Sequence, residues 1–526
     1  MEIYKFIRKR RMKRFLKAIF FTIVCFTCIS VTTTIFTYEN GMENGKGMRE
    51  FYQMDNDEIQ VLVIGSSHTG LGFSPLEMYK NTKITSYNLS SQKQPVALSY
   101  FLAEEAFKKQ SPKVVVLDVA SLFYTWEEIL PENIRIVMDR MPLSLTKVRI
   151  ARYYASILDR DIPEIFEIAE GLSPMYYYHD RWKTLGERDF TSFLITNLKG
   201  QAVNTHITEL SYDINETDKK IESGEFKTPT ILDESMDYFT RLKKLCDENG
   251  AELVLCTTPT LRWSNYKKDI VNELCEETGC KFIDTTEGVV DYKVDMTDEN
   301  HVNAYGAMKV TNYFADFIIE NYGLVGKASK EFDKCLEYYD AYTKVYDYEL
   351  ETDFDTYLEK LDANKEELVI LMAVKNDTVT GLTEKDKELL KNLGLQTDFN
   401  EEAKNCSFVA VIDSGEVVFE KLSEKSEVSF STKEQELNLV EDVNFEILSK
   451  GNACGKYASM TVNNEEYAVN ADGLNIIVFD KESKCVLDTT SFYTPSTSRR
   501  WYRGEDYNNI SKKIFTNYRD WVIKNK

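Results

Sequence analysis

The chain has 526 residues, of which 43% are hydrophobic and 29% are charged. This length predicts two to four domains of about 150 residues each, and the composition excludes a disordered chain. The 64 basic and 86 acidic side chains give a net charge of −22. This balance argues against nucleic-acid binding, which needs a basic face to displace counterions from phosphate.

Basic residues concentrate at the N-terminus. Residues 1–17 hold eight Lys and Arg against Glu2 alone, and the next stretch, 18–37 (AIFFTIVCFTCISVTTTIFT), has no charged side chain. A helix of that length spans about 30 Å, the thickness of the hydrocarbon core of a bilayer. The positive-inside rule then predicts a cytoplasmic tail over 1–17, a single-pass anchor over 18–38, and an extracellular remainder.

Two alternatives to a retained anchor exist. A cleaved signal peptide is disfavoured because the apolar run is long for such a signal, and no clear small-x-small cleavage site follows it. A buried helix of a soluble domain is disfavoured because so long an uncharged stretch is typical of a membrane span. The retained anchor is therefore preferred.

Short apolar runs alternate with amphipathic stretches after a polar stalk at 39–57. This alternation predicts a parallel sheet covered by helices on both faces, within an α/β domain over 58–325. An aromatic-rich segment at about 127–215 breaks the pattern and is predicted to be a helical insertion. The expected strands are 59–65, 84–89, 113–119, 252–257 and 281–284, and the expected helices are 97–109, 235–248, 267–277 and 302–320.

A second module is predicted after a helical connector over 326–350. Its pattern over 351–526 is that of an α+β domain, and no catalytic constellation stands out in it. The expected helix is 354–361, and the expected strands are 368–374, 408–412, 459–462 and 474–479.

The sequence does not decide whether its ten cysteines form disulfides or remain thiols. Cys25 and Cys28 lie in the anchor, and the even number of the others permits disulfides, whereas a role as small buried hydrophobic side chains explains them equally well. Outside the anchor, no CxxC pair and no His-rich neighbour suggests zinc, so neither a metal nor a cofactor is predicted.

The scarcity of histidine narrows the search for catalytic groups. The four are His68, His179, His206 and His301, and the last stands in Asp298-Glu299-Asn300-His301 before a predicted helix. A carboxylate three residues before an imidazole can accept a hydrogen bond from its Nδ1–H, which leaves Nε2 as a base.

A nucleophile for that base follows the first predicted strand. Ser67 stands in Gly65-Ser66-Ser67-His68, at a turn where a hydroxyl is exposed and a following helix offers backbone N–H groups. Each motif alone is more often a capped turn or solvated surface. Together, one after the first strand and one before the last helix, they predict a catalytic triad of Ser67, His301 and Asp298.

This arrangement resembles the SGNH (GDSL-like) hydrolase superfamily over about residues 58–322. It is most similar to the membrane-anchored branch of Gram-positive bacteria that includes the D-alanyl transfer protein of teichoic acid modification. The resemblance implies a three-layer α/β/α parallel sheet, with Ser67 as nucleophile and Asp298 and His301 as acid and base. The matching strings are GSSHTGLGFSP (65–75), YNLSSQKQP (87–95), KVVVLDVASLFY (113–124), YHDRW (178–182), TTPTLRW (257–263) and DMTDENHVNAYGA (295–307).

The chain departs from that family at the oxyanion hole. The family's third block, G-x-N-D, supplies an Asn donor, whereas this chain reads Val119-Ala120-Ser121. Backbone N–H groups of Ser67 and of the turn 88–91 are expected to replace it, with Asn88 or Ser121 as side-chain donors. Ser66 stands where the family has Asp, and His68 is expected either to line the pocket or to be structural. The residues expected around the pocket are thus Ser66, His68, Asn88, Ser90, Ser91 and Ser121.

Two pairs of a cation and a flat ring are candidates for substrate binding. Arg181-Trp182 and Arg262-Trp263 suit sugar faces and phosphate or carboxylate groups. The alternative is that they pack the insertion onto the sheet.

The C-terminal module resembles a permuted interleukin-like EMT inducer (ILEI) domain. Residues 455–494 are similar to the first half of that domain, and 354–361, 367–396 and 407–422 to its second half. The resemblance implies an extracellular module, with glycan binding as one role.

These observations predict a membrane-anchored, extracellular SGNH-type serine acyltransferase or esterase. It would O-acylate or D-alanylate cell-envelope polysaccharide or teichoic-acid-like polyol-phosphate polymers. The resemblance alone implies a multi-span membrane protein that delivers the acyl group. The alternative is a catalytically degenerate surface protein that binds glycans through both modules.

Overall fold

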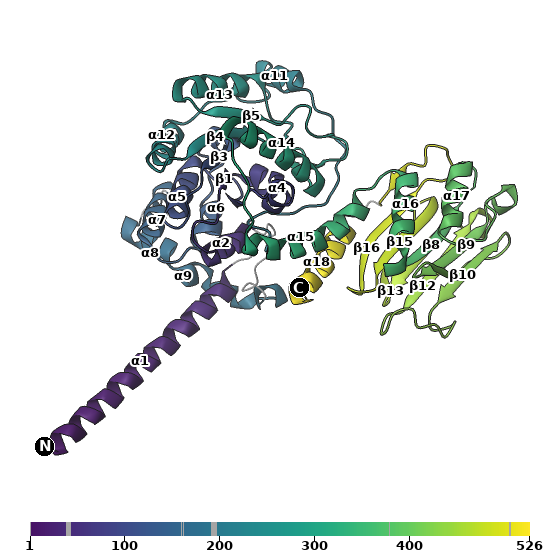
Figure 1. Ribbon diagram of the computed structural model, residues 1–526, viewed down its shortest axis with the longest axis horizontal. Coiled ribbons are helices and arrows are strands. Elements are labelled where there is room, and N and C mark those ends of the chain that lie inside the picture. Colours follow the sequence, from purple (N-terminus) through teal and green to yellow (C-terminus); the bar gives the residue numbers. More distant parts are fainter. Residues whose placement is uncertain are drawn as a thin grey trace. The chain divides into compact units, whose positions relative to one another are not determined.

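The computed structural model describes residues 2–37, 44–158, 160, 162–190, 197–377, 379–503 and 507–525. The chain divides into two compact units, one of residues 1–204 and 209–335 and the other of residues 205–208 and 336–526. The first unit is built on a five-stranded parallel sheet and the second on a curled ten-stranded sheet (Figure 1).

The parallel sheet confirms the five expected strands and their direction. Its order is β2-β1-β3-β4-β5, and all four neighbouring pairs are parallel. Such runs of Val, Ile and Leu are typical of strands with both faces buried. The strands are β1 (Val61–Gly65), β2 (Ser86–Ser90), β3 (Val114–Asp118), β4 (Glu252–Thr257) and β5 (Lys281–Asp284).

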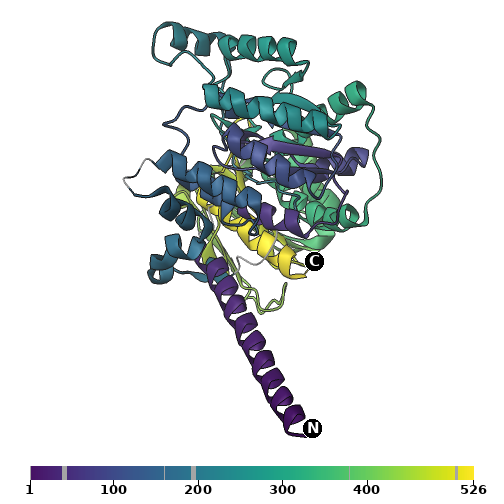
Figure 2. The ribbon, with the colours of Figure 1, turned by 90° about the vertical axis from the view of Figure 1, so that its left-hand side faces the viewer.

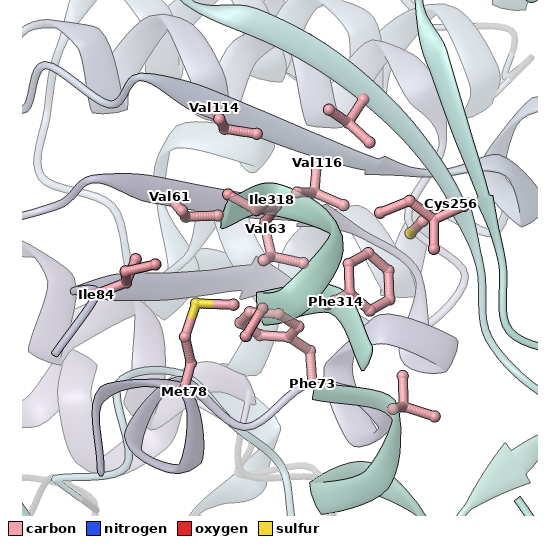
Figure 3. Packing of buried hydrophobic residues seen from close by; sticks show 14 residues of the cluster. Val61, Val63, Phe73, Met78, Ile84, Val114, Val116, Cys256, Phe314 and Ile318 are labelled. Atoms are coloured by element: carbon pink, nitrogen blue, oxygen red, sulfur yellow. The ribbon is translucent and has the colours of Figure 1, made fainter. Parts of the chain in front are cut away.

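Helices cover both faces of this sheet, as the alternation predicts. Successive strand residues point to opposite faces, so Val61 and Val63 join the buried cluster with Met78, Phe314 and Ile318 (Figure 3). The helices on this face are α4 (Pro75–Thr82) and α14 (Ala304–Tyr322), and those on the other include α5 (Val96–Phe107) and α12 (Asp233–Glu248). Helix α13 (Asn265–Thr278) packs on β5, and α11 (Ile214–Glu222) packs on α13.

The insertion is mainly helical between residues 131 and 190, whereas its described residues 197–213 form neither helix nor strand. Its aromatic residues have a packing role, because the buried Arg135 guanidinium lies 4.0 Å from the Tyr177 ring centroid and 5.4 Å from those of Tyr154 and Tyr178. Its helices are α6 (Pro131–Met138), α7 (Leu145–Leu158), α8 (Glu164–Leu172), α9 (Pro174–Tyr178), η2 (His179–Lys183) and α10 (Glu187–Phe190).

One N-terminal helix, α1 (Glu2–Phe36), extends away from the first unit (Figures 1 and 2). Its segment Met12–Phe36, with a mean hydropathy of 2.1, is long and apolar enough to cross a membrane. The hydroxyl groups of Thr27, Thr32 and Thr34 donate to carbonyls four residues earlier, at 2.7–3.0 Å. These bonds satisfy polar groups that a bilayer would otherwise leave unpaired.

Most of the segment expected to be a polar stalk is folded onto the sheet instead. Residues Asn44–Gln53 form helix α2, with Met48 and Phe51 buried. The Tyr87 hydroxyl of β2 donates to the Gly47 carbonyl at 2.6 Å, and its ring lies 5.4 Å from that of Phe51. This amphipathic helix was not predicted because the segment has few apolar residues. Residue 38 of the expected anchor and residues 39–43 of the expected stalk lie outside the described residues.

The second unit confirms the α+β prediction, and α15 (Lys330–Glu349) confirms the helical connector. The expected helix and strands are α16 (Phe354–Asn364), β8 (Leu368–Asn376), β9 (Ser407–Asp413), β13 (Tyr457–Val462) and β15 (Gly473–Asp480). Elements that were not predicted are α17 (Glu384–Asn392), β10 (Glu416–Ser423), β11 (Val428–Ser431), β12 (Phe445–Gly451), β14 (Glu465–Glu466), β16 (Cys485–Phe492), β17 (Trp501–Tyr502) and α18 (Tyr507–Asn525).

All ten cysteines are unpaired thiols. Cys246 and Cys256 are buried in the first unit, and burial raises the pKa of the Cys246 thiol to about 12. These two side chains therefore act as small hydrophobic core residues.

Candidate active site

The candidate nucleophile lies on the turn between the first strand and the first helix of the sheet. Strand β1 ends at Gly65, Ser66 caps helix α3 (Ser67–Gly72), and Ser67 is the first residue of that helix. The Ser66 hydroxyl accepts a hydrogen bond from the His68 N–H at 3.2 Å. This local cap fixes the direction in which Ser67 leaves the strand.

The turn is held from the neighbouring strand by Asp118, a residue that the sequence did not identify as part of the site. Its carboxylate, at the end of β3, accepts hydrogen bonds from the Ser66 N–H at 3.0 Å, from the Ser66 hydroxyl, and from the Ala120 N–H at 2.9 Å. Asp118 could have been found from its place in the sequence at the end of a predicted strand. The carboxyl ends of neighbouring parallel strands meet at one edge of a sheet.

This close approach requires glycine at position 65. A Cβ on Gly65 would lie 2.2 Å from the Cβ of Asp118. We expect Gly65→Ala to separate β1 from β3 and to lower the free energy of unfolding of the first unit by about 1–3 kcal/mol, the usual cost of overpacking. Urea denaturation followed by hydrogen exchange of β1 peptides measures this effect.

Gly186→Ala is the matched control for that substitution, because a Cβ there meets no atom within 4 Å. It is expected to change the unfolding free energy by less than about 0.5 kcal/mol. Equal stabilities of the two variants would contradict the steric argument.

The candidate base and acid face each other across a short hairpin. Strands β6 (Met296–Asp298) and β7 (His301–Val302) pair antiparallel, with Asp298 opposite His301. The His301 Nδ1 lies 2.8 and 2.9 Å from the two carboxylate oxygens of Asp298. Burial acts to raise the pKa of Asp298, but its hydrogen bond to His301 and the attraction between the two groups lower it overall. Asp298 is therefore the ionised partner that orients the ring.

The hairpin brings this pair to the nucleophile. The His301 Nε2 lies 2.8 Å from the Ser67 Oγ, although 234 positions separate the two residues in the chain. The structure thus brings Ser67, His301 and Asp298 together in one line of hydrogen bonds. Such a line can move a proton from a serine hydroxyl to an imidazole while the carboxylate holds the ring.

Neighbouring segments fix the hairpin at both ends. The Asn303 side chain caps α14 by accepting from the N–H groups of Tyr305 and Gly306, both at 3.1 Å, and donates to the Val294 carbonyl at 2.7 Å. The Leu261 N–H donates to the Glu299 carbonyl at 2.8 Å. The position of His301 is therefore set by the β4–α13 loop and by α14 together.

Two further basic side chains lie at the site. The His68 ring packs edge-on against that of His301, with centroids 5.3 Å apart, and burial lowers the pKa of His68 to about 4. Lys267, in the first turn of α13, lies close enough to His68 to contribute to that shift. Burial lowers the pKa of Lys267 to about 8, so its ammonium group is largely protonated at pH 7. The sequence did not identify Lys267 as a site residue.

The other residues expected around the pocket use their side chains within the protein. Asn88 donates from Nδ2 to the carbonyls of Thr69 at 2.8 Å and Phe73 at 3.2 Å, and the Ser121 hydroxyl donates to the Asp118 carbonyl at 2.6 Å. The hydroxyl of Ser90 bonds to that of Thr69, and the hydroxyl of Ser91 bonds to Gln94. These contacts give Asn88, Ser90, Ser91 and Ser121 roles in holding the turns around the site.

The backbone of the turn 88–91 is similarly engaged. The Asn88 N–H donates to the Lys199 carbonyl at 3.0 Å, and the Ser91 N–H donates to the Gly65 carbonyl at 3.1 Å. The N–H groups of the first turn of a helix, by contrast, lack intrahelical partners. Among the oxyanion donors expected from the sequence, the geometry therefore favours the Ser67 N–H.

The two Arg-Trp pairs have different positions. Trp263 is 2% exposed, its Nε1–H donates to Asp284 at 3.3 Å, and its ring centroid lies 5.9 Å from that of Phe282. This favours the packing alternative for Trp263, whereas Arg262 is exposed. Arg181 donates to the Phe36 carbonyl at 2.6 Å, so Arg181-Trp182 lies at the end of α1 instead of at the triad.

No protein-family model matches the chain, and no curated protein is significantly similar to it.

Proposed function

We propose that this protein is a membrane-anchored serine acyltransferase or esterase of the SGNH type, acting outside the cell on cell-envelope polymers. The observation that carries the proposal is the hydrogen-bonded line from Ser67 Oγ through His301 to Asp298. Serine, imidazole and carboxylate in this order are the groups that acyl transfer requires.

In the first half of the reaction, Ser67 Oγ attacks the carbonyl carbon of the acyl donor and His301 Nε2 takes the hydroxyl proton. The tetrahedral intermediate collapses as His301 returns that proton to the leaving group, which leaves an acyl ester on Ser67. In the second half, His301 deprotonates an acceptor hydroxyl, which attacks the ester and releases Ser67. A sugar or polyol hydroxyl gives transfer, and water gives hydrolysis.

The oxyanion formed in each half needs hydrogen-bond donors near Ser67. The Asn of the SGNH third block has no counterpart here, and the side chains of Asn88 and Ser121 are engaged within the protein. We assign the first donor to the Ser67 N–H at the start of α3. One missing donor costs a factor of about 10²–10³ in rate, so we expect slow turnover compared with a complete oxyanion hole.

The charges around the site are mixed. The Lys267 Nζ donates to the Arg262 carbonyl at 3.0 Å. Burial lowers the pKa of Lys267, whereas the carboxylates of Glu128 and Asp118 act to raise it. An anionic polymer is therefore proposed as acceptor from the resemblance and not from the charge at the site. The basic residues in the first half of α1, up to Lys17, favour a cytoplasmic N-terminus. The rest of the chain would then face outward, and an acyl donor would be delivered through a membrane partner.

The decisive experiment is covalent labelling of the full chain in detergent with a fluorophosphonate, followed by intact mass measurement. We expect one adduct per chain, lost in Ser67→Ala and in His301→Ala. Ser111→Ala is the matched control, because that exposed hydroxyl bonds only to Asp57 among the described residues. Labelling that persists in Ser67→Ala would contradict the proposal.

Glycan binding by the second unit is the alternative function. A surface hollow of about 390 Å³ in this unit is lined by amide, hydroxyl and charged side chains, which suit sugar hydroxyl groups, together with Leu437 and Val443. The lining includes Thr432, Lys433, Asp442, Asn444, Asn463 and Asn464. An unlabelled chain that still binds cell-envelope polysaccharide, and loses that binding in Asn464→Ala, would favour this alternative.

A further inference from the structure

The level at which α1 leaves the membrane can be read from the chain. Its uncharged stretch runs from Ala18 to Thr37, and at about 1.5 Å per residue this stretch matches a hydrocarbon core of about 30 Å. With the basic residues up to Lys17 at one boundary, Phe36 and Thr37 lie at the other. Whatever packs against them lies at the level of the lipid headgroups.

Segments of the insertion pack at this level. The Arg181 guanidinium donates to the Phe36 carbonyl at 2.6 Å and pairs with Asp189 at 2.5 Å, while Thr37 is buried. Helix α1 contacts α9, η2 and α10, and α9 lies beside its C-terminal end in Figure 1. The Phe36 carbonyl at the end of α1 is therefore capped by Arg181, which holds the insertion against that end of the helix.

These same segments expose large apolar side chains. Tyr176 of α9, Trp182 of η2 and Phe190 of α10 are between 61 and 67% exposed, and so are Ile165 and Phe166 of α8, which packs on α9. Exposed apolar groups gathered on one part of a surface mark an interaction site. Trp and Tyr at the height of the headgroups are typical of a membrane interface.

We propose that the segment 162–190, formed by α8, α9, η2 and α10, is a second membrane-binding element that inserts these side chains into the headgroup–acyl boundary of the bilayer spanned by α1. The partner is lipid because the surface is continuous with the exit point of α1 and its residues are those of interfacial anchors. With this element, the first unit is attached to the membrane at two places and keeps one orientation on the bilayer surface. Attachment through α1 alone would allow the unit to rotate relative to that surface. This inference does not depend on the reaction catalysed.

Bromolipid quenching of tryptophan fluorescence tests the proposal. The full chain is reconstituted alone into nanodiscs of phosphatidylcholine and phosphatidylglycerol, with and without bromine on the acyl chains near the headgroup. We expect bromolipid to quench part of the emission, and Trp182→Phe to remove most of the quenchable part. Phe190→Trp should add to it.

Trp126→Phe is the matched control. Trp126 is 52% exposed and lies beside Pro95 and Leu232, at the α5 and α12 side of the unit. It should leave the quenchable emission unchanged. Bromolipid quenching that is the same in Trp182→Phe and wild type would overturn the proposal. Quenching of Trp182 by aqueous acrylamide in the nanodisc would also overturn it. That second result would assign the surface to a protein partner instead.

Discussion

Ser67→Ala is expected to lower the hydrolysis of p-nitrophenyl acetate by the full chain by about 10⁴- to 10⁶-fold relative to wild type, because it removes the hydroxyl proposed to form the acyl-enzyme. His301→Ala should cause a loss of the same size, since the Ser67 hydroxyl then lacks the base that lies 2.8 Å away. Asp298→Ala should cost less, about 10²- to 10⁴-fold, because the ring keeps its position but loses its orienting carboxylate. Stopped and continuous absorbance assays measure these ratios.

Non-additivity distinguishes a triad from three independent contributions. The double variant Ser67→Ala/His301→Ala should be no slower than Ser67→Ala, because residues that act as a unit lose their effect together. A double variant that is slower by the product of the two single effects would contradict the proposed relay. An activity of Ser67→Ala within tenfold of wild type would exclude Ser67 as nucleophile.

Lys199→Met is expected to destabilise the first unit by about 3–5 kcal/mol, because it leaves a buried carboxylate without its partner. Lys199 and Glu50 are each 2% exposed, and the Lys199 Nζ lies 3.1 Å from Glu50 Oε1 and 2.9 Å from Glu331 Oε1. The cluster ties α2 and α15 to the loop 197–202. That loop bonds to α3 through the Ala202 N–H and the Gly70 carbonyl at 2.9 Å, so the loss should reach the nucleophile turn.

The cost of Lys199→Met should depend on pH. Burial already raises the pKa of Glu50 despite the nearby Lys199, and loss of the ammonium raises it further. A carboxyl group whose pKa is raised on folding takes up a proton in the folded state, so stability increases as the pH falls towards the ordinary value of a Glu. Hydrogen exchange of β1 and β2 peptides at pH 5 and pH 8 should therefore show a smaller loss at pH 5.

Two variants control this experiment. Glu50→Gln added to Lys199→Met should restore part of the lost stability, because it removes the unpaired charge. Lys227→Met removes an ion pair with Glu127 in which both side chains are more than 80% exposed, and should change stability by less than about 0.5 kcal/mol. If the buried and the exposed lysine cost the same, the buried cluster would not stabilise the unit.

The sequence by itself determined the parallel sheet, the apolar N-terminal helix and the three residues that the structure brings together in one line of hydrogen bonds. The strands are continuous runs of Val, Ile and Leu, whose burial on both faces leaves a signal that depends only on residue type. These three residues could be proposed from the sequence because the chain has only four histidines. Ser67 follows a strand end, and Asp298 stands three residues before His301. These are local signals, which a single sequence carries in full.

Only the tertiary structure decided how the surrounding polar side chains are used. Asp118 accepts hydrogen bonds from a turn 52 positions earlier in the chain, and Lys267 comes to the site from another helix. The side chains of Asn88 and Ser121 donate their hydrogen bonds to nearby carbonyl groups. The tertiary structure also decided how α2 packs, because its few apolar residues contact β2. It likewise decided the positions of Trp263 and Trp182. Both follow an arginine in the sequence, yet one is buried against β5 and the other is exposed beside α1. The partners of a hydrogen bond or a packing contact come from distant segments, so residue type and spacing along the chain cannot specify them.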